Sequence, residues 1–146
     1  MVDNELSVQI ESIRCESVIP QVKYTHFYAL HTSAGDRVER RFSDFEALIE
    51  LLNLEFLSEI LPAMPDRDAT LLAVQDTNDI RLRQRKDDFQ ILLQSLLNND
   101  KVKQSTLFLD FFREEKFDAD KARRKLLDGK PHLAYLTEKI KAKNEG

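Results

Sequence analysis

The chain has 146 residues, of which 42% are hydrophobic and 33% are charged, so it holds enough apolar material for one folded core. With three glycines, four prolines and no apolar run of bilayer length, it is neither collagen-like nor membrane-spanning. Its formal net charge of -4 argues against diffuse attraction to nucleic acid or anionic lipid, so any anion site must be local.

The first residues and the cysteine content indicate the cellular setting. Acidic Asp3 and Glu5 lie where a secretory signal would need a basic and then an apolar stretch, so no signal is expected. The single cysteine, Cys15, cannot form an internal disulfide, which fits a reducing, cytoplasmic environment. Because it lies in a strand-like run, we expect Cys15 to be a buried small apolar residue.

Three runs with strand character come first in the chain. Residues 6–13 alternate apolar and polar side chains, as a half-buried strand does, and residues 24–32 are rich in threonine and aromatic residues. The turn sequence of residues 33–36, Ser-Ala-Gly-Asp, separates the second run from a third over residues 37–42. Short connections favour antiparallel neighbours, so the sequence predicts a three-stranded meander.

Helical spacing replaces the strand pattern after Ser43. We predict a helix over residues 44–54, with Ser43 as its N-cap and Glu46 completing a capping box. Its apolar face consists of Phe45, Leu48, Ile49 and Leu52. The strongest helical pattern covers residues 79–97. Ser105 caps a further short helix, which contains Leu107, Leu109, Phe111 and Phe112.

Two features lie between the first two helices. Pro62 and Pro65 favour an extended segment, and a stiff connector is the commoner use of such spacing in a folded domain than an SH3 ligand. The apolar run at residues 70–74 has two interpretations that the sequence leaves open, a core segment or an exposed apolar loop.

Arginines gather where predicted elements begin or end. Arg40 and Arg41 lie beside Phe42 at the end of the third strand. Guanidinium groups bind phosphate oxygens bidentately, and an aromatic ring can support a ring-shaped ligand. The first half of the 79–97 helix carries Arg81, Arg83, Arg85 and Lys86. Cations there oppose the helix dipole, so the cluster indicates a purpose beyond solubility unless local pairs, Arg81 with Asp79 or Arg85 with Asp88, offset it.

The C-terminal tail, residues 118–146, is charged and helical in pattern. Gly129 interrupts it, and Pro131 is suited to begin a second helical piece. The sequence leaves open whether its apolar residues pack on the domain, on a partner protein or in a dimer. These residues are Leu126, Leu133, Leu136 and Ile140.

Read in order, these motifs resemble the PX (phox homology) domain, and sorting nexins in particular. The resemblance covers Leu6 to Glu115 and depends on the Arg-Arg-Phe-Ser-Asp-Phe element at residues 40–45, the Pro-x-x-Pro-x-Arg connector at residues 62–67, and the arginine-rich helix start. It implies an α+β fold, in which a three-stranded antiparallel meander packs against a helical subdomain. Residues 1–117 would form this domain, and residues 118–146 a helical C-terminal extension.

The resemblance also implies a function. PX domains bind phosphoinositides, most often phosphatidylinositol 3-phosphate on early endosomes, and serve endosomal sorting and vesicle trafficking as peripheral membrane proteins. It therefore implies that this chain is not an enzyme, needs no cofactor and does not bind nucleic acid. Retromer-like coat proteins or cargo proteins remain open as partners.

Four side chains match the headgroup residues of the family. By the resemblance, Arg41 grips the 3-phosphate and the ring of Phe42 lies under the inositol. Arg67 matches a basic residue, usually lysine, that contacts the 1-phosphate, and Arg85 matches the arginine that binds the 4- and 5-hydroxyls. Arg40 is expected to be a structural or secondary charge.

The apolar run after the connector matches the loop that family members insert into the bilayer, which implies insertion of Leu71, Leu72 and Val74. The sequence departs from the family at Asp66, where a glycine is frequent, and at Arg67, where lysine is usual. The second proline of the usual Pro-Pro-x-Pro is also replaced, by Ala63.

Two other functional classes are weighed against lipid binding. An enzyme is disfavoured because no nucleophile or metal-ligand spacing surrounds His26, His31 or His132. A PX-like protein-interaction adaptor that has lost lipid binding is the serious alternative, since Asp66 and the acidic net charge favour it. Direct lipid binding distinguishes this adaptor from a phosphoinositide-binding module.

Overall fold

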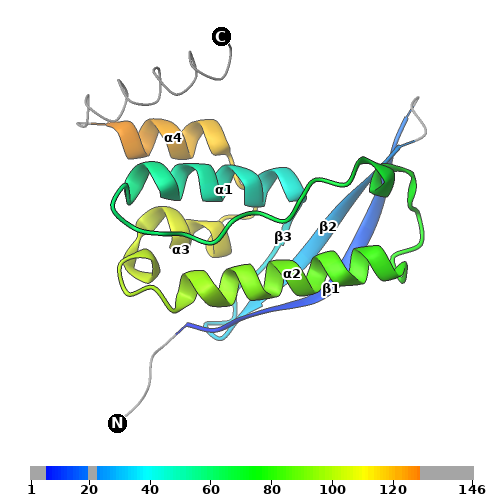
Figure 1. Cartoon of the computed structure of the whole chain (residues 1–146), viewed down its shortest axis with the longest axis horizontal. Coiled ribbons are helices and arrows are strands. Elements are labelled where there is room, and N and C mark those ends of the chain that lie inside the picture. Colours follow the sequence, from blue (N-terminus) through cyan, green and yellow to red (C-terminus); the bar gives the residue numbers. More distant parts are fainter. Residues whose placement is uncertain (1–5, 20–22, 129–146) are drawn as a thin grey trace.

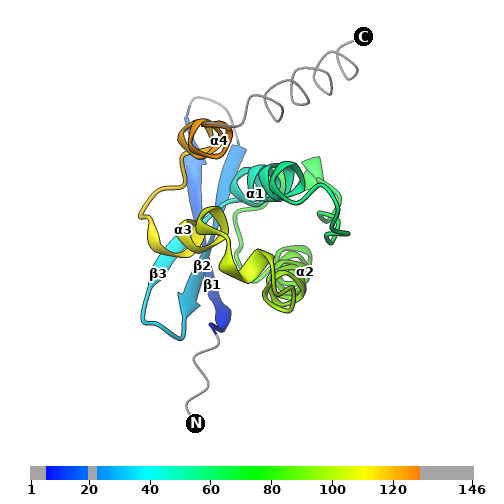
Figure 2. The same cartoon turned by 90° about the vertical axis from the view of Figure 1, so that its left-hand side faces the viewer.

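The computed structural model describes residues 6–19 and 23–128, and in it helices cover one face of a three-stranded antiparallel sheet (Figures 1 and 2). The strands, in the order β1-β2-β3, are β1 (Val8–Val18), β2 (Lys23–Thr32) and β3 (Arg37–Arg40). The α-helices are α1 (Phe42–Glu55), α2 (Ile80–Leu97), α3 (Thr106–Arg113) and α4 (Ala119–Leu127). Two 3-10 helices, η1 (Ala69–Ala73) and η2 (Val102–Gln104), lie between them. The predicted meander with a helical subdomain is confirmed.

The strands of the meander are joined as the sequence predicts, with one irregularity. Gly35, with a φ of 95°, makes the turn from β2 to β3, in a backbone region that side chains disfavour. A bulge between Ile10 and Ser12 shifts the register of β1 against β2. The shift brings Ile13 opposite Tyr28, and Ile13 packs against the buried core.

The outer edge of β1 meets α2 through one side chain. The Gln90 amide accepts a hydrogen bond from the Ile10 N–H at 2.8 Å and donates one to the Val8 carbonyl at 2.8 Å. Gln90 thus satisfies backbone groups that a further strand would otherwise pair with.

An aromatic cluster joins the sheet to the helices. The rings of Phe45 on α1 and Phe89 on α2 stack with their centroids 4.0 Å apart. The Tyr28 ring on β2 meets both edge-on, at 6.5 Å from Phe45 and 5.0 Å from Phe89. The buried residues of α1 include Phe45, Leu48, Ile49 and Leu52, so the predicted apolar face is confirmed.

The start of α1 differs from the prediction. Since β3 ends at Arg40 and α1 begins at Phe42, Arg41 is the N-cap, two residues earlier than Ser43. The Asp44 carboxylate accepts the Arg41 N–H at 3.0 Å, so the reciprocal bond comes from Asp44 and not from Glu46. The later cap is confirmed, because the Ser105 hydroxyl accepts the Phe108 N–H at 3.3 Å.

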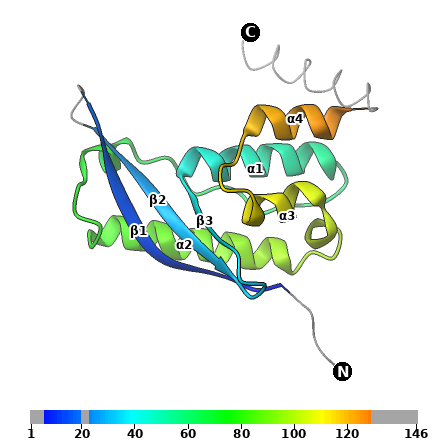
Figure 3. The same cartoon turned by 180° about the vertical axis from the view of Figure 1, so that it is seen from behind.

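The beginning of the predicted extension packs on the domain. Helix α4 lies along α1 on the side away from α2 (Figures 1 and 3). There, Leu126 covers Leu51 and Leu54 in a small buried cluster. The rest of the tail, including the predicted break at Gly129 and its three apolar residues, lies outside the described residues.

The structure also bears on the predictions for Cys15 and for membrane-spanning segments. Cys15 is half-buried, and this burial raises the pKa of its thiol. Within residues 6–19 and 23–128, no helix has both the length and the apolar composition needed to cross a bilayer.

Candidate functional site

The two neighbouring arginines at the end of β3 have opposite environments. Arg40 is 1% exposed and donates hydrogen bonds only to backbone carbonyls, among them Phe111 at 3.0 Å, Glu115 at 3.1 Å and Glu114. Carbonyls at the end of a helix carry partial negative charge, so the end of α3 compensates this buried cation. Burial also lowers the pKa of Arg40. Arg40 therefore joins β3 to α3, the structural role that the sequence favoured.

The next residue, Arg41, faces solvent and a cavity. Its side chain is 54% exposed, and its nearest carboxylate, Asp44, lies 3.9 Å from its Nε. At that distance and exposure the ion pair is weak, so the guanidinium keeps most of its capacity to bind an anion.

A cavity of about 220 Å³ brings together all four predicted headgroup residues, Arg41, Phe42, Arg67 and Arg85. They come from the start of α1, the connector and the second turn of α2, which lie far apart in the sequence. The remaining wall consists of Tyr24, Thr25, His26, Tyr28, Ser43, Asp68, Ala69, Leu71 and Leu72. The cavity is therefore cationic and aromatic at its base, as binding of a ring-shaped phosphate ester requires.

The three arginines of the cavity are held to different extents. Arg85 is 9% exposed, and its Nη2 donates to the Asp66 carbonyl at 2.5 Å. Arg67 is more than half exposed and pairs with Glu46 on α1, at 2.9 Å between Nη2 and Oε1. The predicted local pair of Arg85 with Asp88 does not form, since Asp88 accepts from Gln84 instead.

The ring of Phe42 lies at the centre of this arrangement. The guanidinium carbons of Arg67 and Arg85 are each 4.5 Å from its centroid, within the range of cation–π attraction. The Phe42 ring also lies 5.9 Å from that of Phe89 in the core. The Phe42 ring, which would support a ligand ring, is thus held by its contact with Phe89 and lies beside two cations.

The deepest wall of the cavity includes Tyr28. Burial raises the pKa of its phenol to about 12, and the nearby Arg85 opposes part of that rise. Tyr28 is therefore a neutral wall residue near neutral pH and adds no negative charge to the anion site.

The apolar run beside the cavity corrects one prediction. Leu71 and Val74 are buried against Leu82 on α2, so they are core residues and not the inserting residues that we expected. Val74 is the C-cap of η1, and its N–H donates to the Leu71 carbonyl at 3.0 Å, which holds the two residues close together. Leu72 points the other way and is 42% exposed, so its insertion stays a prediction. The His26 ring nitrogen Nε2 lies 2.6 Å from the Val74 carbonyl and fixes the end of this segment to β2.

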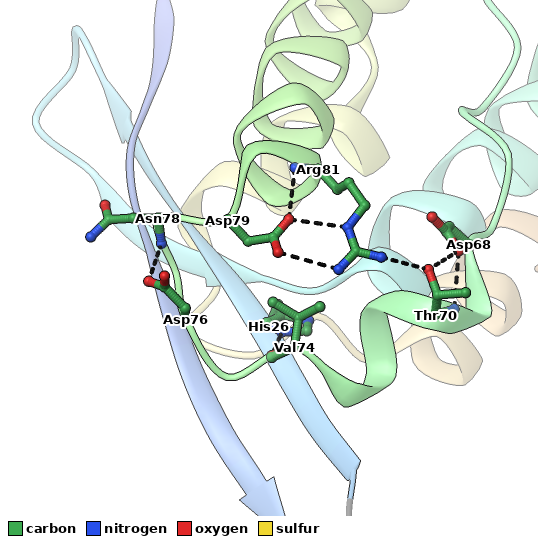
Figure 4. A network of polar contacts seen from close by, with 8 residues as sticks. All are labelled: His26, Asp68, Thr70, Val74, Asp76, Asn78, Asp79 and Arg81. Atoms are coloured by element: carbon green, nitrogen blue, oxygen red, sulfur yellow. Dashed lines mark hydrogen bonds and ion pairs between the residues drawn. The ribbon is translucent and has the colours of Figure 1, made fainter.

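A polar network attaches η1 to the start of α2 (Figure 4). Asp68 accepts hydrogen bonds from the Thr70 N–H at 3.0 Å and the Thr70 hydroxyl at 2.6 Å. Arg81 donates to the Thr70 hydroxyl at 3.0 Å and pairs with Asp79, as the sequence had suggested. The bonds from Thr70 lower the pKa of Asp68, and those from Arg81 lower the pKa of Asp79. The network holds η1 in place beside the cavity.

Sequence reasoning missed other exposed apolar residues at this end of the molecule. Ile19, which follows β1, is 86% exposed, and Ile80 at the first turn of α2 is also exposed. The end of β1, the start of β2, η1 and the start of α2 lie near one another (Figures 1 and 3). The signal was available in the sequence, because Val18 and Ile19 are two apolar residues directly before Pro20.

A larger depression, of about 820 Å³, lies over the outer face of the sheet and reaches the end of α3. Its charges largely pair with one another. Arg14 contacts Glu39 at 2.8 Å and Glu16 at 2.6 Å, and Arg37 contacts Glu11 at 3.1 Å. An anion would have to compete with these carboxylates, so the smaller cavity is the stronger candidate.

Comparisons with known proteins bear on the family and the fold of the chain. The family model described as PX domain matches residues 28–115, which is more than half of the chain. The X-ray structure of a designed CISK-PX domain aligns with a TM-score of 0.62 at 21% identity, covering 74% of this chain and 99% of its own, which supports the fold. The solution structure of the VAM7P PX domain aligns with a TM-score of 0.46 at 19% identity, covering 75% of this chain and 99% of its own. A search among curated proteins finds no match.

Proposed function

Because the chain belongs to the PX domain family, whose members are in general phosphoinositide-binding, membrane-targeting modules, we propose that it recognises phosphatidylinositol 3-phosphate on endosomal membranes. The observation that carries the proposal is the convergence of Arg41, Phe42, Arg67 and Arg85 on one cavity of about 220 Å³. A headgroup with two phosphates needs two separated cations and donors for its hydroxyls, and the cavity provides them.

Each side chain takes one part of the headgroup. The exposed Arg41 binds the 3-phosphate, Phe42 supports the inositol ring, and Arg67 binds the 1-phosphate. Arg85, held by the Asp66 carbonyl, donates to the 4- and 5-hydroxyls. Because Arg85 is fixed where an additional phosphate would need space, the cavity favours the singly 3-phosphorylated lipid.

Headgroup contacts alone give modest membrane affinity, since charge-assisted hydrogen bonds contribute about 1.5–3 kcal/mol each. Insertion of apolar side chains adds to it, at roughly 1.5–3 kcal/mol for a fully buried large side chain. Leu72 on η1 and Ile19, directly after β1, are exposed, and η1 and the end of β1 lie at the same end of the molecule (Figure 1). We assign to these two residues the insertion into the bilayer that the sequence suggested for the whole apolar run at residues 70–74.

The cellular role follows from the resemblance to sorting nexins. The chain acts as a peripheral membrane protein on the cytoplasmic side of early endosomes and serves endosomal sorting and protein transport. Residues 1–117 form the lipid-binding domain in this proposal, and residues 118–146 are its helical extension. Retromer-like coat proteins and cargo are its expected classes of partner.

The experiment that tests the function is a liposome sedimentation panel. Vesicles of phosphatidylcholine carry, in turn, each singly, doubly and triply phosphorylated phosphoinositide. We expect selective sedimentation with phosphatidylinositol 3-phosphate. Absence of binding to every phosphoinositide would favour the adaptor that has lost lipid binding. Equal binding to doubly and triply phosphorylated lipids would contradict the role given to Arg85.

A further inference from the structure

The ligand-free cavity is occupied in part by one of its own arginines. The Arg67 guanidinium carbon lies 4.5 Å from the centroid of the Phe42 ring, where a ligand ring would stack. Its Nη2 is simultaneously 2.9 Å from the Glu46 carboxylate. Glu46 follows Phe42 by four residues on α1, so the two side chains share one face of that helix. This geometry holds Arg67 across the aromatic platform.

Of the two cations beside Phe42, only Arg67 is free to leave. Arg85 lies equally close to the ring, but it is 9% exposed and bound to the Asp66 carbonyl. Arg67 and Glu46 have side chains that are 55% and 51% exposed, so solvent can replace their contact at little cost. A ring that stacks on Phe42 must therefore displace Arg67.

We propose that Glu46 is an internal competitor of the lipid headgroup. Its carboxylate pairs with the Arg67 guanidinium as a phosphate would, and it holds Arg67 over the Phe42 ring until a phosphate takes its place. The proposal deepens the proposed function and rests on it, because the competing ligand is the 1-phosphate of the phosphoinositide. Glu46 thereby lowers the affinity for phosphoinositides in general, although it does not itself contact the lipid.

The size of the effect follows from the exposure of the pair. Exposed ion pairs are weak, and the headgroup must break this one in order to bind. The pair therefore lowers headgroup affinity by only about two- to fivefold. A carboxylate near a phosphate site also repels the ligand directly. The test must separate this diffuse repulsion from the contact with Arg67.

The chain offers a matched control in Glu50. It lies one turn after Glu46 on the same helix, is similarly exposed, and pairs with Arg123 on α4 at 3.2 Å. Neither glutamate is among the residues that line the cavity, so the two differ in the arginine with which each one pairs. Glu46→Gln and Glu50→Gln therefore change the net charge equally, and only the first releases Arg67.

Calorimetric titration with soluble inositol 1,3-bisphosphate measures the competition. We expect Glu46→Gln to tighten binding about two- to fivefold and Glu50→Gln to leave it unchanged. In an Arg67→Ala background, Glu46→Gln should have no further effect, because the contact is already absent. An equal gain in both backgrounds would show diffuse repulsion and overturn the proposal, and so would no gain in either.

A second measurement needs no ligand. In nuclear magnetic resonance spectra of the free protein, the Arg67 side-chain protons should show the ring-current shift of Phe42, and Glu46→Gln should reduce it. An Arg67 that resonates like a free arginine in the unaltered chain would overturn the proposal whatever the lipid result. A clear ring-current shift without headgroup binding by any variant would instead overturn the proposed function, and the competition with it.

Discussion

The two ends of α1 serve different purposes. Its start carries Arg41 and Phe42, which line the candidate headgroup cavity, and the exposed Glu46, which pairs with the cavity residue Arg67. Its last turns carry Leu51 and Leu54, which are buried under Leu126 of α4. One helix thus joins a polar site that is open to solvent to an apolar contact that excludes it.

The difference teaches that binding and stability should be separable along this helix. Groups that must meet a ligand remain incompletely paired, as Arg41 does, and contribute little to folding. Groups that close a core contribute mainly through burial. Substitutions at the two ends should therefore affect different measurements, and the following four predictions test this separation.

The largest expected effect is at the end of α1 that α4 covers. Leu51→Ala removes a fully buried side chain and should lower the free energy of unfolding by about 2–5 kcal/mol. Urea denaturation followed by circular dichroism measures this change. Affinity for soluble inositol 1,3-bisphosphate should be unaltered wherever the variant remains folded. A parallel fall of affinity and stability would contradict the separation.

At the other end, Arg41→Ala should weaken headgroup binding without affecting the fold. Loss of charge-assisted hydrogen bonds costs about 1.5–3 kcal/mol, enough to abolish sedimentation with phosphatidylinositol 3-phosphate liposomes. Arg67→Ala should weaken binding less, because it contacts the phosphate common to all phosphoinositides. Arg37→Ala, which removes an exposed side chain on β3, is the control with the same change in charge. Unchanged liposome binding by Arg41→Ala would disprove the site assignment.

The segment beside the cavity combines both behaviours in adjacent residues. Leu72→Asp should reduce liposome binding but leave soluble headgroup affinity intact, because only a bilayer receives the exposed side chain. Leu71→Asp should instead lower the melting temperature, since it places a charge in the small core with Leu82. If Leu72→Asp weakens both kinds of binding equally, insertion is not its role.

The smallest effect concerns acid pH. Because the pKa of Asp68 is lowered in the folded chain, the bonds from Thr70 stabilise η1 above the ordinary aspartate pKa of about 3.9 and are lost as pH falls through the lowered value. The Thr70 amide resonance should therefore titrate below about pH 4. Asp68→Asn keeps an accepting oxygen without the titration, and this variant should show no such step. A titration step of the same size in Asp68→Asn would show that a group other than Asp68 causes it.

The sequence predicted the face of α1 that packs against the main core better than the rest of the helix. Periodicity identified Phe45, Leu48, Ile49 and Leu52, because a single buried face follows the helical repeat. It did not identify Leu51 and Leu54, whose burial depends on α4. It also placed the N-cap at Ser43, since the Ser-x-x-Glu pattern does not reveal that β3 ends one residue before the cap.

The order of three sequence motifs, and their resemblance to the PX domain, predicted the four headgroup residues of the cavity. The fold brings these four residues together. What the sequence could not provide is the direction of neighbouring side chains. Burial of Leu71 and exposure of Leu72 follow from a 3-10 turn that the apolar run does not specify. The contact of Arg67 with Glu46 joins residues 21 positions apart, so no local pattern reports it.

Gln90 bears on how this protein behaves at high local concentration, as on a crowded membrane. Sheet edges with unpaired N–H and carbonyl groups are templates on which strands of other molecules can assemble. By occupying the Ile10 N–H and the Val8 carbonyl, Gln90 removes two of these groups at the start of β1. Where many copies bind one membrane surface, Gln90 thus disfavours pairing of this edge with a strand of a neighbouring molecule.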